Sequence, residues 1–208
     1  MTDMKKITAL GMTLICLALG VAGCGGPKAV QLIDNLPEVN FDVDYPVGQI
    51  TKDVTVTQSF ISNCNQIDSI QLYGATYIRQ NTATVQVRVL LTEQVGDLQG
   101  KELARFILDS ALMKDNSIIE LAFGDGAEQA PCVVDAFCDK ALNKELSGKP
   151  CLIEITSPDG EPDFSPTFWM TEEDIYADGV LTVEPSNTSL FEPLREITPL
   201  IVIVIGSL

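Results

Sequence analysis

Cysteine and carboxylate side chains carry most of the chemistry that this sequence offers. The chain of 208 residues has 6 Cys and 29 Asp plus Glu, and it has no His. Without histidine, the sequence lacks the base of Ser-His-Asp and Cys-His nucleophiles and the usual nitrogen ligand of zinc or haem. Thiol chemistry, hydrolysis by paired carboxylates and calcium binding by oxygens stay open.

The cysteine spacings do not favour a metal site. Cys132 and Cys138 are six residues apart, and Cys64 and Cys151 are isolated, so there is no C-x-x-C pair for zinc or for thiol exchange. Two arrangements remain. The four cysteines form the disulfides Cys132–Cys138 and Cys64–Cys151, as an exported protein would favour, or they stay as reduced, partly buried thiols.

Acidic residues gather in three short clusters. Calcium takes several loop oxygens of this kind, but no cluster follows the D-x-[DN]-x-[DN]-G spacing, and no two carboxylates are placed against each other as in a glycosidase. We therefore expect solvated acidic loops, no metal and no cofactor, and we rank carboxylate-dependent glycoside hydrolysis third among the functions considered. The clusters are Asp125 with Glu128, then Asp159, Glu161 and Asp163, then Glu172, Glu173 and Asp174.

One cysteine near the N-terminus has a different setting. Lys5 and Lys6 precede an apolar stretch over 7–22, which is shorter than the roughly 20 residues of a membrane-spanning helix. The stretch ends in Val-Ala-Gly-Cys24, which resembles the lipobox of bacterial lipoproteins. The resemblance implies a signal peptide over 1–23 and a lipidated Cys24 as the mature N-terminus. The alternative is a plain secretory signal with a coincidental cysteine.

The charge of the chain limits its partners. A formal net charge of −16 repels phosphate backbones and anionic lipid headgroups, so we expect no nucleic-acid partner. Attachment to a membrane would come from acyl chains on Cys24 and not from a basic patch. Because Gly25 and not Asp follows the cysteine, we expect an extracytoplasmic protein anchored to the outer membrane or to the outer face of a single membrane.

The remainder of the chain reads as strands. Residues 84–91 give the clearest pattern, with Val85, Val87 and Val89 on one face and polar residues on the other. Gly, Asp and Pro turns separate this segment from similar ones. The predicted strands are 54–60, 67–77, 84–91, 101–108, 118–123, 151–156, 167–170, 179–183 and 200–205, the last of them apolar on both faces as in a central strand.

Two segments depart from this rhythm. Residues 132–146 show apolar positions three to four apart between Pro131 and Gly148, which predicts one short helix. Residues 24–50 carry Gly, Pro and scattered acids, which predicts a flexible lipidated tether. We therefore expect one domain over 51–208, an all-β antiparallel sandwich or barrel with a single helix.

Three motifs point to a family. The first is Gln58-Ser-Phe60 followed by Ile67-Asp-Ser-Ile70, the second is the Thr76-Tyr-Ile-Arg-Gln-Asn81 turn with the strand that follows it to Val85, and the third is Phe168-Trp169 with the later Asp174-Ile-Tyr-Ala-Asp-Gly179 loop. Together they resemble cell-envelope β-sandwich modules of the galactose-binding-like, jelly-roll type. The resemblance covers about residues 54–205 and implies a jelly-roll sandwich that binds glycans or partner surfaces beside the envelope. The segment 128–150 departs from the pattern, and no glycosyltransferase is attached.

The candidate ligand-binding residues are aromatic or planar. Trp169, the only tryptophan, could stack on the apolar face of a sugar. It would then project outward while Phe168 enters the core; in the reverse arrangement, Trp169 would be the core residue. Arg79 and Asn81 could bind hydroxyl groups or could simply secure their turn. Tyr77 and Tyr176 are the remaining candidates.

The function we expect is binding without catalysis. The leading hypothesis is a lipid-anchored envelope protein that recognises a glycan or a neighbouring envelope protein. The alternative is a structural or accessory subunit whose sandwich packs permanently into an envelope assembly.

Overall fold

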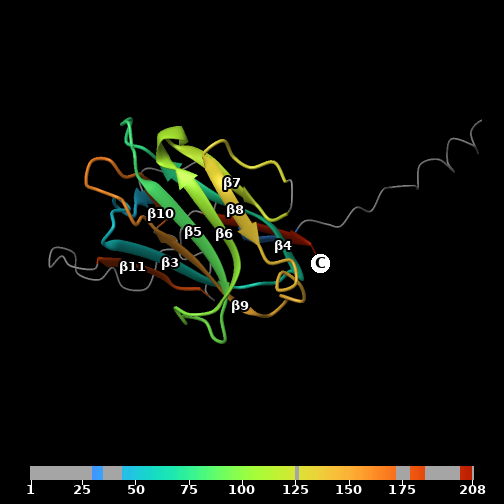
Figure 1. The fold of residues 1–208 in the computed structure, drawn as a ribbon. Coiled ribbons are helices and arrows are strands. Elements are labelled where there is room, and N and C mark those ends of the chain that lie inside the picture. The colour runs from blue at the N-terminus through green and yellow to red at the C-terminus, as the bar shows by residue number, and fades with distance from the viewer. Residues whose placement is uncertain (1–29, 35–43, 125–126, 172–178, 186–201, 208) are drawn as a thin grey trace, which may run out of the picture.

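The computed structural model describes residues 30–34, 44–124, 127–171, 179–185 and 202–207. Cys24, Asp125, Tyr176, the Glu172–Asp174 cluster and the expected signal peptide lie outside these residues. Twelve strands and one short 3-10 helix make up the described part (Figure 1). They are β1 (Val30–Asp34), β2 (Asp44–Pro46), β3 (Val54–Ile61), β4 (Gln66–Ala75), β5 (Thr84–Leu91), β6 (Lys101–Asp109), η1 (Ser110–Leu112), β7 (Ser117–Ala122), β8 (Val133–Cys138), β9 (Pro150–Thr156), β10 (Thr167–Thr171), β11 (Leu181–Pro185) and β12 (Val202–Ser207).

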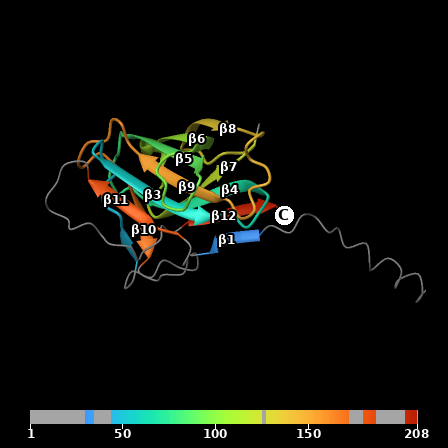
Figure 2. The ribbon, with the colours of Figure 1, turned by 90° about the horizontal axis from the view of Figure 1, so that it is seen from below.

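The strands form two antiparallel sheets packed as a sandwich (Figures 1 and 2). In sheet 1, β4 pairs with β7 along one edge. Along its other edge, β4 pairs first with β12 and, at its end, with β10. β1 then pairs with β12, and β2 pairs with β10. Sheet 2 has the order β11-β3-β9-β5-β6-β8.

The strand order is that of a jelly roll. Successive strands from β2 to β5 alternate between the sheets, and eight of the strands give the orders β2-β10-β4-β7 and β3-β9-β5-β6. This interleaving of early and late strands is the topology of a jelly roll. The predicted all-β jelly-roll sandwich is confirmed.

The core lies between the inner faces of the two sheets. On β5, Val85, Val87 and Val89 are fully buried while Gln86 and Arg88 face outward, as the alternation predicts. Phe60, Phe106 and Phe168 are the largest fully buried side chains of this core. Ile153 and Ile155 of β9 join them.

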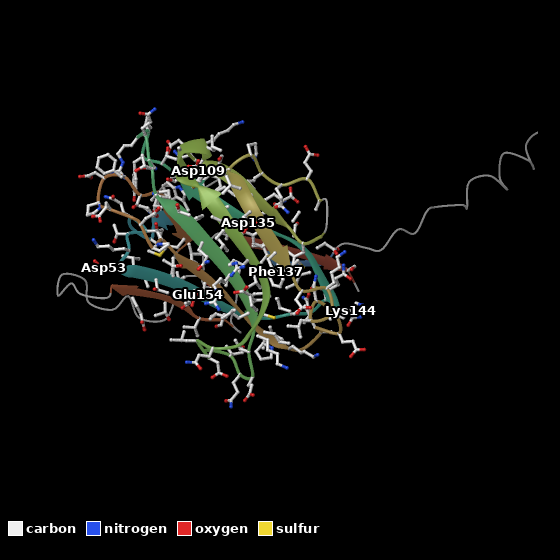
Figure 3. The ribbon with its side chains drawn as sticks, in the orientation of Figure 1. Asp53, Asp109, Asp135, Phe137, Lys144 and Glu154 are labelled. Atoms are coloured by element: carbon white, nitrogen blue, oxygen red, sulfur yellow. The ribbon has the colours of Figure 1, made fainter. Side chains whose placement is uncertain are left out.

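The outer face of sheet 2 is polar. Arg88 of β5 forms ion pairs with Glu102 of β6 at 2.9 Å and with Glu154 of β9 at 2.8 Å. Glu154 and Phe137 lie on this face in Figure 3, and the Arg105 guanidinium lies 5.9 Å from the centre of the Phe137 ring. Cross-strand charge pairs of this kind hold a sheet in register.

The helix predicted over 132–146 is wrong. Residues 133–138 form β8, which pairs with β6, and the chain then turns repeatedly up to β9. Apolar residues at 133, 134 and 137 are also compatible with a strand, and pairing with a neighbouring strand outweighed the local helical spacing.

Side-chain hydrogen bonds shape the turns that follow β8. The Asp139 carboxylate accepts from the amides of Ala141 and Leu142, which stops the strand. Asn143 then pairs with both backbone groups of Ile67, accepting from its amide at 2.9 Å and donating to its carbonyl at 2.8 Å. This buried amide acts as a substitute for a neighbouring strand at the start of β4.

Part of the segment expected as a tether also belongs to the sheets. In Figure 2, β1 lies beside β12, and the register pairs Val30 with Gly206. β2 pairs with β10, where Pro46 is opposite Trp169. The strand predicted over 200–205 is paired on both sides, by β1 and by β4, as expected for a central strand.

Candidate ligand-binding face

Trp169 projects outward from sheet 1. On β10, Phe168 is 1% exposed and packs in the core, whereas Trp169 is partly exposed. Side chains alternate along a strand, so Trp169 lies on the face of the sheet opposite to Phe168. The structure thus selects the outward arrangement for Trp169 and assigns the core position to Phe168.

Four strands bring an apolar row together around this tryptophan. Pro46 of β2 is opposite Trp169, the continuing register of β10 and β4 sets Trp169 opposite Tyr73, and Tyr73 is opposite Ile118 of β7. Directly opposed residues have their side chains on the same face of a sheet. We name these four residues the aromatic row. At about 4.8 Å between strands, the row is roughly 14 Å long.

Contacts within the row fix its shape. The rings of Trp169 and Tyr73 meet edge to face, with centroids 6.4 Å apart and planes at 67°. The Trp169 indole Nε1 donates to Oδ1 of Asn116 at 3.1 Å. Ile118 ends the row and is 50% exposed. The indole is therefore held in one orientation while the row keeps solvent-accessible apolar surface.

Polar side chains lie next to the row on the same face. Gln71 lies two residues from Tyr73 along β4, and Glu120 lies two residues from Ile118 along β7. The register pairs Gln71 with Glu120. Glu120 is exposed and Gln71 is partly exposed. An apolar strip beside an amide and a carboxylate matches a sugar, which offers an apolar C–H face and a rim of hydroxyl groups.

Arg79 and Asn81 lie apart from the aromatic row and hold loops together. The Arg79 guanidinium stacks 4.7 Å from the centre of the Tyr77 ring, pairs with Asp163 at 3.1 Å and donates to the Ser165 carbonyl at 3.2 Å. Asn81 is 1% exposed, and its amide donates to the Thr76 carbonyl at 3.4 Å. Both residues secure the turn, as the alternative interpretation of the sequence had it.

The turn that these residues secure also depends on Asp115. Its carboxylate accepts from the Thr76 amide at 2.6 Å and from the Thr76 hydroxyl at 3.0 Å. Burial acts to raise the pKa of Asp115, but hydrogen bonds from Thr76 and from the amides of Ile78 and Tyr77 outweigh it, so the pKa lies below its usual value.

The acidic cluster of the β9–β10 loop is divided among three partners. Asp159 accepts from the amide and hydroxyl of Thr84, Glu161 pairs with Lys52 at 2.9 Å, and Asp163 pairs with Arg79. Within the described ranges, no three Cys, Asp or Glu side chains converge as metal ligands. Glu128 is exposed, and the other acidic residues singled out by the sequence lie outside these ranges.

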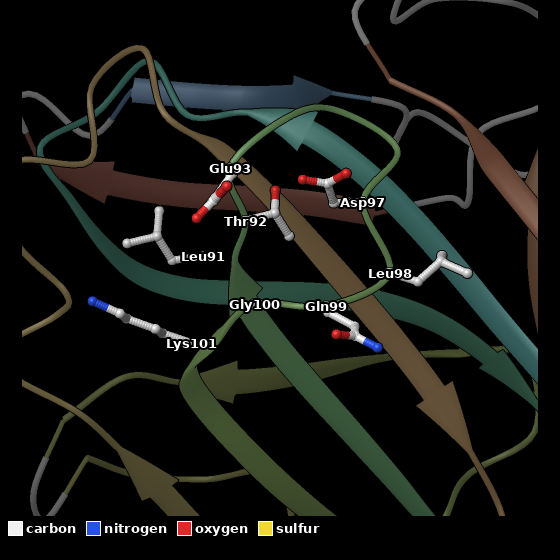
Figure 4. Close-up of a pocket in the computed structure, with 8 residues that line it drawn as sticks. All are labelled: Leu91, Thr92, Glu93, Asp97, Leu98, Gln99, Gly100 and Lys101. Atoms are coloured by element: carbon white, nitrogen blue, oxygen red, sulfur yellow. The ribbon is translucent and has the colours of Figure 1, made fainter.

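One hollow of the described surface lies on sheet 2, which does not carry the aromatic row. It is an open depression of about 820 Å³ in the β5–β6 hairpin, between Leu91 and Lys101 (Figure 4). The Asp97 carboxylate accepts from the Gln94 amide and so shapes the hairpin itself. Because one hairpin supplies the whole lining, we place no site there.

The four described cysteines are thiols and not disulfides in this structure. A Cys132–Cys138 bridge is incompatible with β8, because Val133 pairs with Leu108 and Cys138 pairs with Ala104, four residues away along β6. That separation is roughly 13 Å at 3.3 Å per residue, and bridged Cα atoms are under about 7 Å apart. This predicted pairing is wrong.

Cys64 and Cys151 are neighbours in the core. Both are fully buried, and burial raises the pKa of the Cys64 thiol. Burial, together with the nearby Cys64, raises the pKa of Cys151 to about 12. Both thiols are therefore protonated and unreactive at neutral pH, and a Cys64–Cys151 bridge stays a prediction.

Sequence reasoning missed three members of the aromatic row, which are Pro46, Tyr73 and Ile118, and also Asn116. Alternation along 67–77 could have assigned Tyr73 to one face of a strand. It could not have placed Tyr73 beside Trp169, because strand neighbours are set by pairing of segments far apart in the chain.

Comparison of the sequence with models of known protein families finds no match, and comparison with curated proteins finds none either. In the described part of the chain, the longest helical element is one turn, and none is long and apolar enough to cross a membrane. The resemblances to lipoproteins and to galactose-binding-like modules remain predictions.

Proposed function

We propose that this protein is a lipid-anchored binding protein of the cell envelope, and that its aromatic row binds a glycan without catalysis. The observation that carries the proposal is the row itself, in which four strands present Pro46, Trp169, Tyr73 and Ile118 on one outer face. Buried apolar residues are usual in a sandwich. An outward aromatic pair with polar neighbours requires another explanation.

The chemistry of the row favours a sugar as its ligand. The aromatic rings would stack on C–H faces, while Gln71, Glu120 and Asn116 offer hydrogen bonds to hydroxyl groups. A length of roughly 14 Å allows contact with more than one sugar ring. The register of β4 and β7 sets Glu120 two residues along the strand from the row, where a carboxylate can accept hydrogen bonds from sugar hydroxyl groups.

The anchor is the second part of the proposal and rests on the sequence alone. The lipobox-like Val-Ala-Gly-Cys24 would place acyl chains on Cys24. In Cys24→Ser, processing after Gly23 and acyl labelling should disappear together. A labelled Cys24→Ser protein would contradict the anchor.

The single tryptophan makes the glycan proposal directly testable. Because Trp169 lies in the row, its fluorescence should change when N-acetylglucosamine oligomers or solubilised peptidoglycan occupy the face. Tyr73→Ala keeps this reporter and should weaken binding by about tenfold or more. Phe137→Ala, which removes an aromatic side chain 44% exposed on sheet 2, is the matched control. Equal affinities for these two variants, or no saturable change with any envelope glycan, would contradict the proposal.

An accessory subunit remains the second candidate, and β8 is the observation that favours it. This strand is the last of sheet 2, and Val134 and Phe137 on it are exposed. An exposed apolar edge strand can pair with a strand of another protein. If Val134→Lys released the protein from an envelope complex while the glycan titration stayed unchanged, this candidate would replace the first.

A further inference from the structure

Two loops at one end of the sandwich present apolar side chains to solvent. In the β4–β5 loop, Ile78 is 91% exposed and Tyr77 is exposed beside it; in the β9–β10 loop, Phe164 is 53% exposed. We name these three residues the apolar tip. The Thr82 amide donates to the Phe164 carbonyl at 3.0 Å, and Arg79 bridges the two loops through Tyr77 and Asp163. A backbone hydrogen bond and an ion pair therefore join the two loops into one surface feature.

The backbone of the tip is strained in a way that keeps Ile78 outward. Tyr77 has φ 57° and Ile78 has φ 56°, in the left-handed region that a β-branched residue rarely adopts. The Asp115 carboxylate compensates by binding the amide and hydroxyl of Thr76 and the next two amides. Strain that the surrounding structure enforces is typical of binding and switch segments.

The position of the tip relative to the proposed anchor follows from strand register. Val30 is paired with Gly206, and Gly206 is paired with Ile67 near the start of β4. Ala75, where β4 ends just before the tip, lies eight residues further, or roughly 26 Å at 3.3 Å per residue. Cys24 precedes Val30 by six residues, which span at most about 21 Å. The sandwich therefore cannot stand inverted with its tip in the anchoring membrane.

The charges around the tip also disfavour a lipid surface. The loops at this end carry more acids than bases, and an acidic surface is repelled by anionic headgroups. A convex apolar tip with an acidic rim instead matches a protein pocket that is apolar inside and basic at its edge. Among the described residues of these loops, the acids are Asp53, Asp109, Asp115, Asp159, Glu161 and Asp163, and the bases are Lys52, Arg79 and Lys114.

We propose that the apolar tip is a docking site for a protein on the side away from the anchoring membrane, and that Ile78 fills an apolar pocket with a basic rim on that partner. The inference rests on the anchor at Cys24 proposed above and is independent of glycan binding. It assigns the two surfaces different roles, with glycan on the outer face of sheet 1 and protein at the loop end.

The first test maps contacts of the full, processed protein in its own cells. A photo-crosslinking amino acid at position 78 should give one cross-linked protein, and the same group at position 98 should not. Leu98 is a matched control because it is 50% exposed in the β5–β6 hairpin, which lies at the opposite end of β5 from the tip. Equal products at 78 and 98, or none at 78, would overturn the proposal.

The second test uses the cross-linked protein after identification and purification. Ile78→Asn suits the left-handed backbone, so it should leave folding intact, yet it should weaken binding by about thirtyfold, whereas Leu98→Asn should have no effect. Because the rim is acidic, binding should also weaken as salt rises. Unchanged affinity in Ile78→Asn, or binding insensitive to salt, would contradict the assigned pocket.

A third measurement separates protein docking from membrane insertion. An environment-sensitive dye at position 78 of the lipidated protein, bound to vesicles of phosphatidylethanolamine and phosphatidylglycerol, should not be quenched by brominated acyl chains. Quenching would overturn the proposal in favour of a membrane-inserting tip. If the protein does not remain on the vesicles, that result contradicts the proposed anchor at Cys24 instead. A failed fluorescence titration would contradict only the proposal of glycan binding.

Discussion

Phe168 and Trp169 are adjacent in sequence, and their truncation should have opposite consequences. Phe168 is 1% exposed and packs against the core side of β4, where the position of a Cβ on Gly74 would be 3.7 Å from its ring. Replacing a fully buried phenylalanine by alanine costs about 3–5 kcal/mol in the free energy of unfolding, because a cavity remains. The aromatic row would stay in place on the other face of the sheet.

Trp169→Ala removes a smaller set of interactions. It loses the edge-to-face contact with Tyr73, worth about 0.5–1.5 kcal/mol, and the hydrogen bond to Asn116, worth about 0.5–1.5 kcal/mol. The partly exposed ring leaves no enclosed cavity. We expect a total loss of about 1–3 kcal/mol in the free energy of unfolding, together with weakened glycan binding.

Urea denaturation of residues 25–208, followed by circular dichroism, measures both losses on one scale. With a slope of about 2 kcal/mol per molar urea, Phe168→Ala should lower the midpoint by about 1.5–2.5 M and Trp169→Ala by about 0.5–1.5 M. Circular dichroism is needed because Trp169→Ala removes the only tryptophan. If Trp169→Ala lowered the midpoint as much as Phe168→Ala, Trp169 would be a core residue and the aromatic row would lose its central member.

Three further predictions concern the supporting structure. Asn143→Ala should cost about 2–3 kcal/mol in urea denaturation, because it leaves the buried amide and carbonyl of Ile67 without their partner; a loss below about 0.5 kcal/mol would show that water replaces the amide. The pKa of Asp115 is depressed in the folded state, so its stabilisation is complete above the unfolded value near 3.8 and is lost as pH falls through the lower folded value. The melting temperature of Asp115→Asn should therefore lack this part of the fall in acid. Parallel curves of melting temperature against pH for the two proteins would refute the prediction. A thiol reagent should label at most Cys138 in the native protein, since the other described cysteines are buried, and rapid native labelling of a further cysteine would contradict the packing. After unfolding without reductant, two reactive thiols in place of four in the mature chain would establish the Cys64–Cys151 bridge.

Much of the fold was predictable because strand periodicity is local. The segment 84–91 has the same limits in the sequence prediction and in β5, and its three valines lie in the core. The alternation at Phe168 and Trp169 correctly restricted the core position to one of the two residues. Which residue it was depended on the side from which sheet 2 covers sheet 1, and no pattern within five residues of β10 contains that information.

Local patterns were misleading where pairing outweighed them. Val133 and Phe137 fit a helix by spacing, yet pairing with β6 made them part of an edge strand, and the same pairing separated Cys132 from Cys138. Arg79 and Asn81 were correctly seen as a special turn. Their contacts with Asp163 and Thr76 could be recognised as structural only once the loops were placed together.

Composition and periodicity along the chain were enough to establish the acidic character, the all-β class and most strand positions, since each depends on neighbours a few residues apart. The aromatic row and the apolar tip depend instead on strand order and register. Pro46 and Trp169 are more than a hundred residues apart in sequence and meet only because β2 and β10 pair. Such pairing is chosen by the packing of both sheets around one core, and that choice belongs to the folded molecule as a whole.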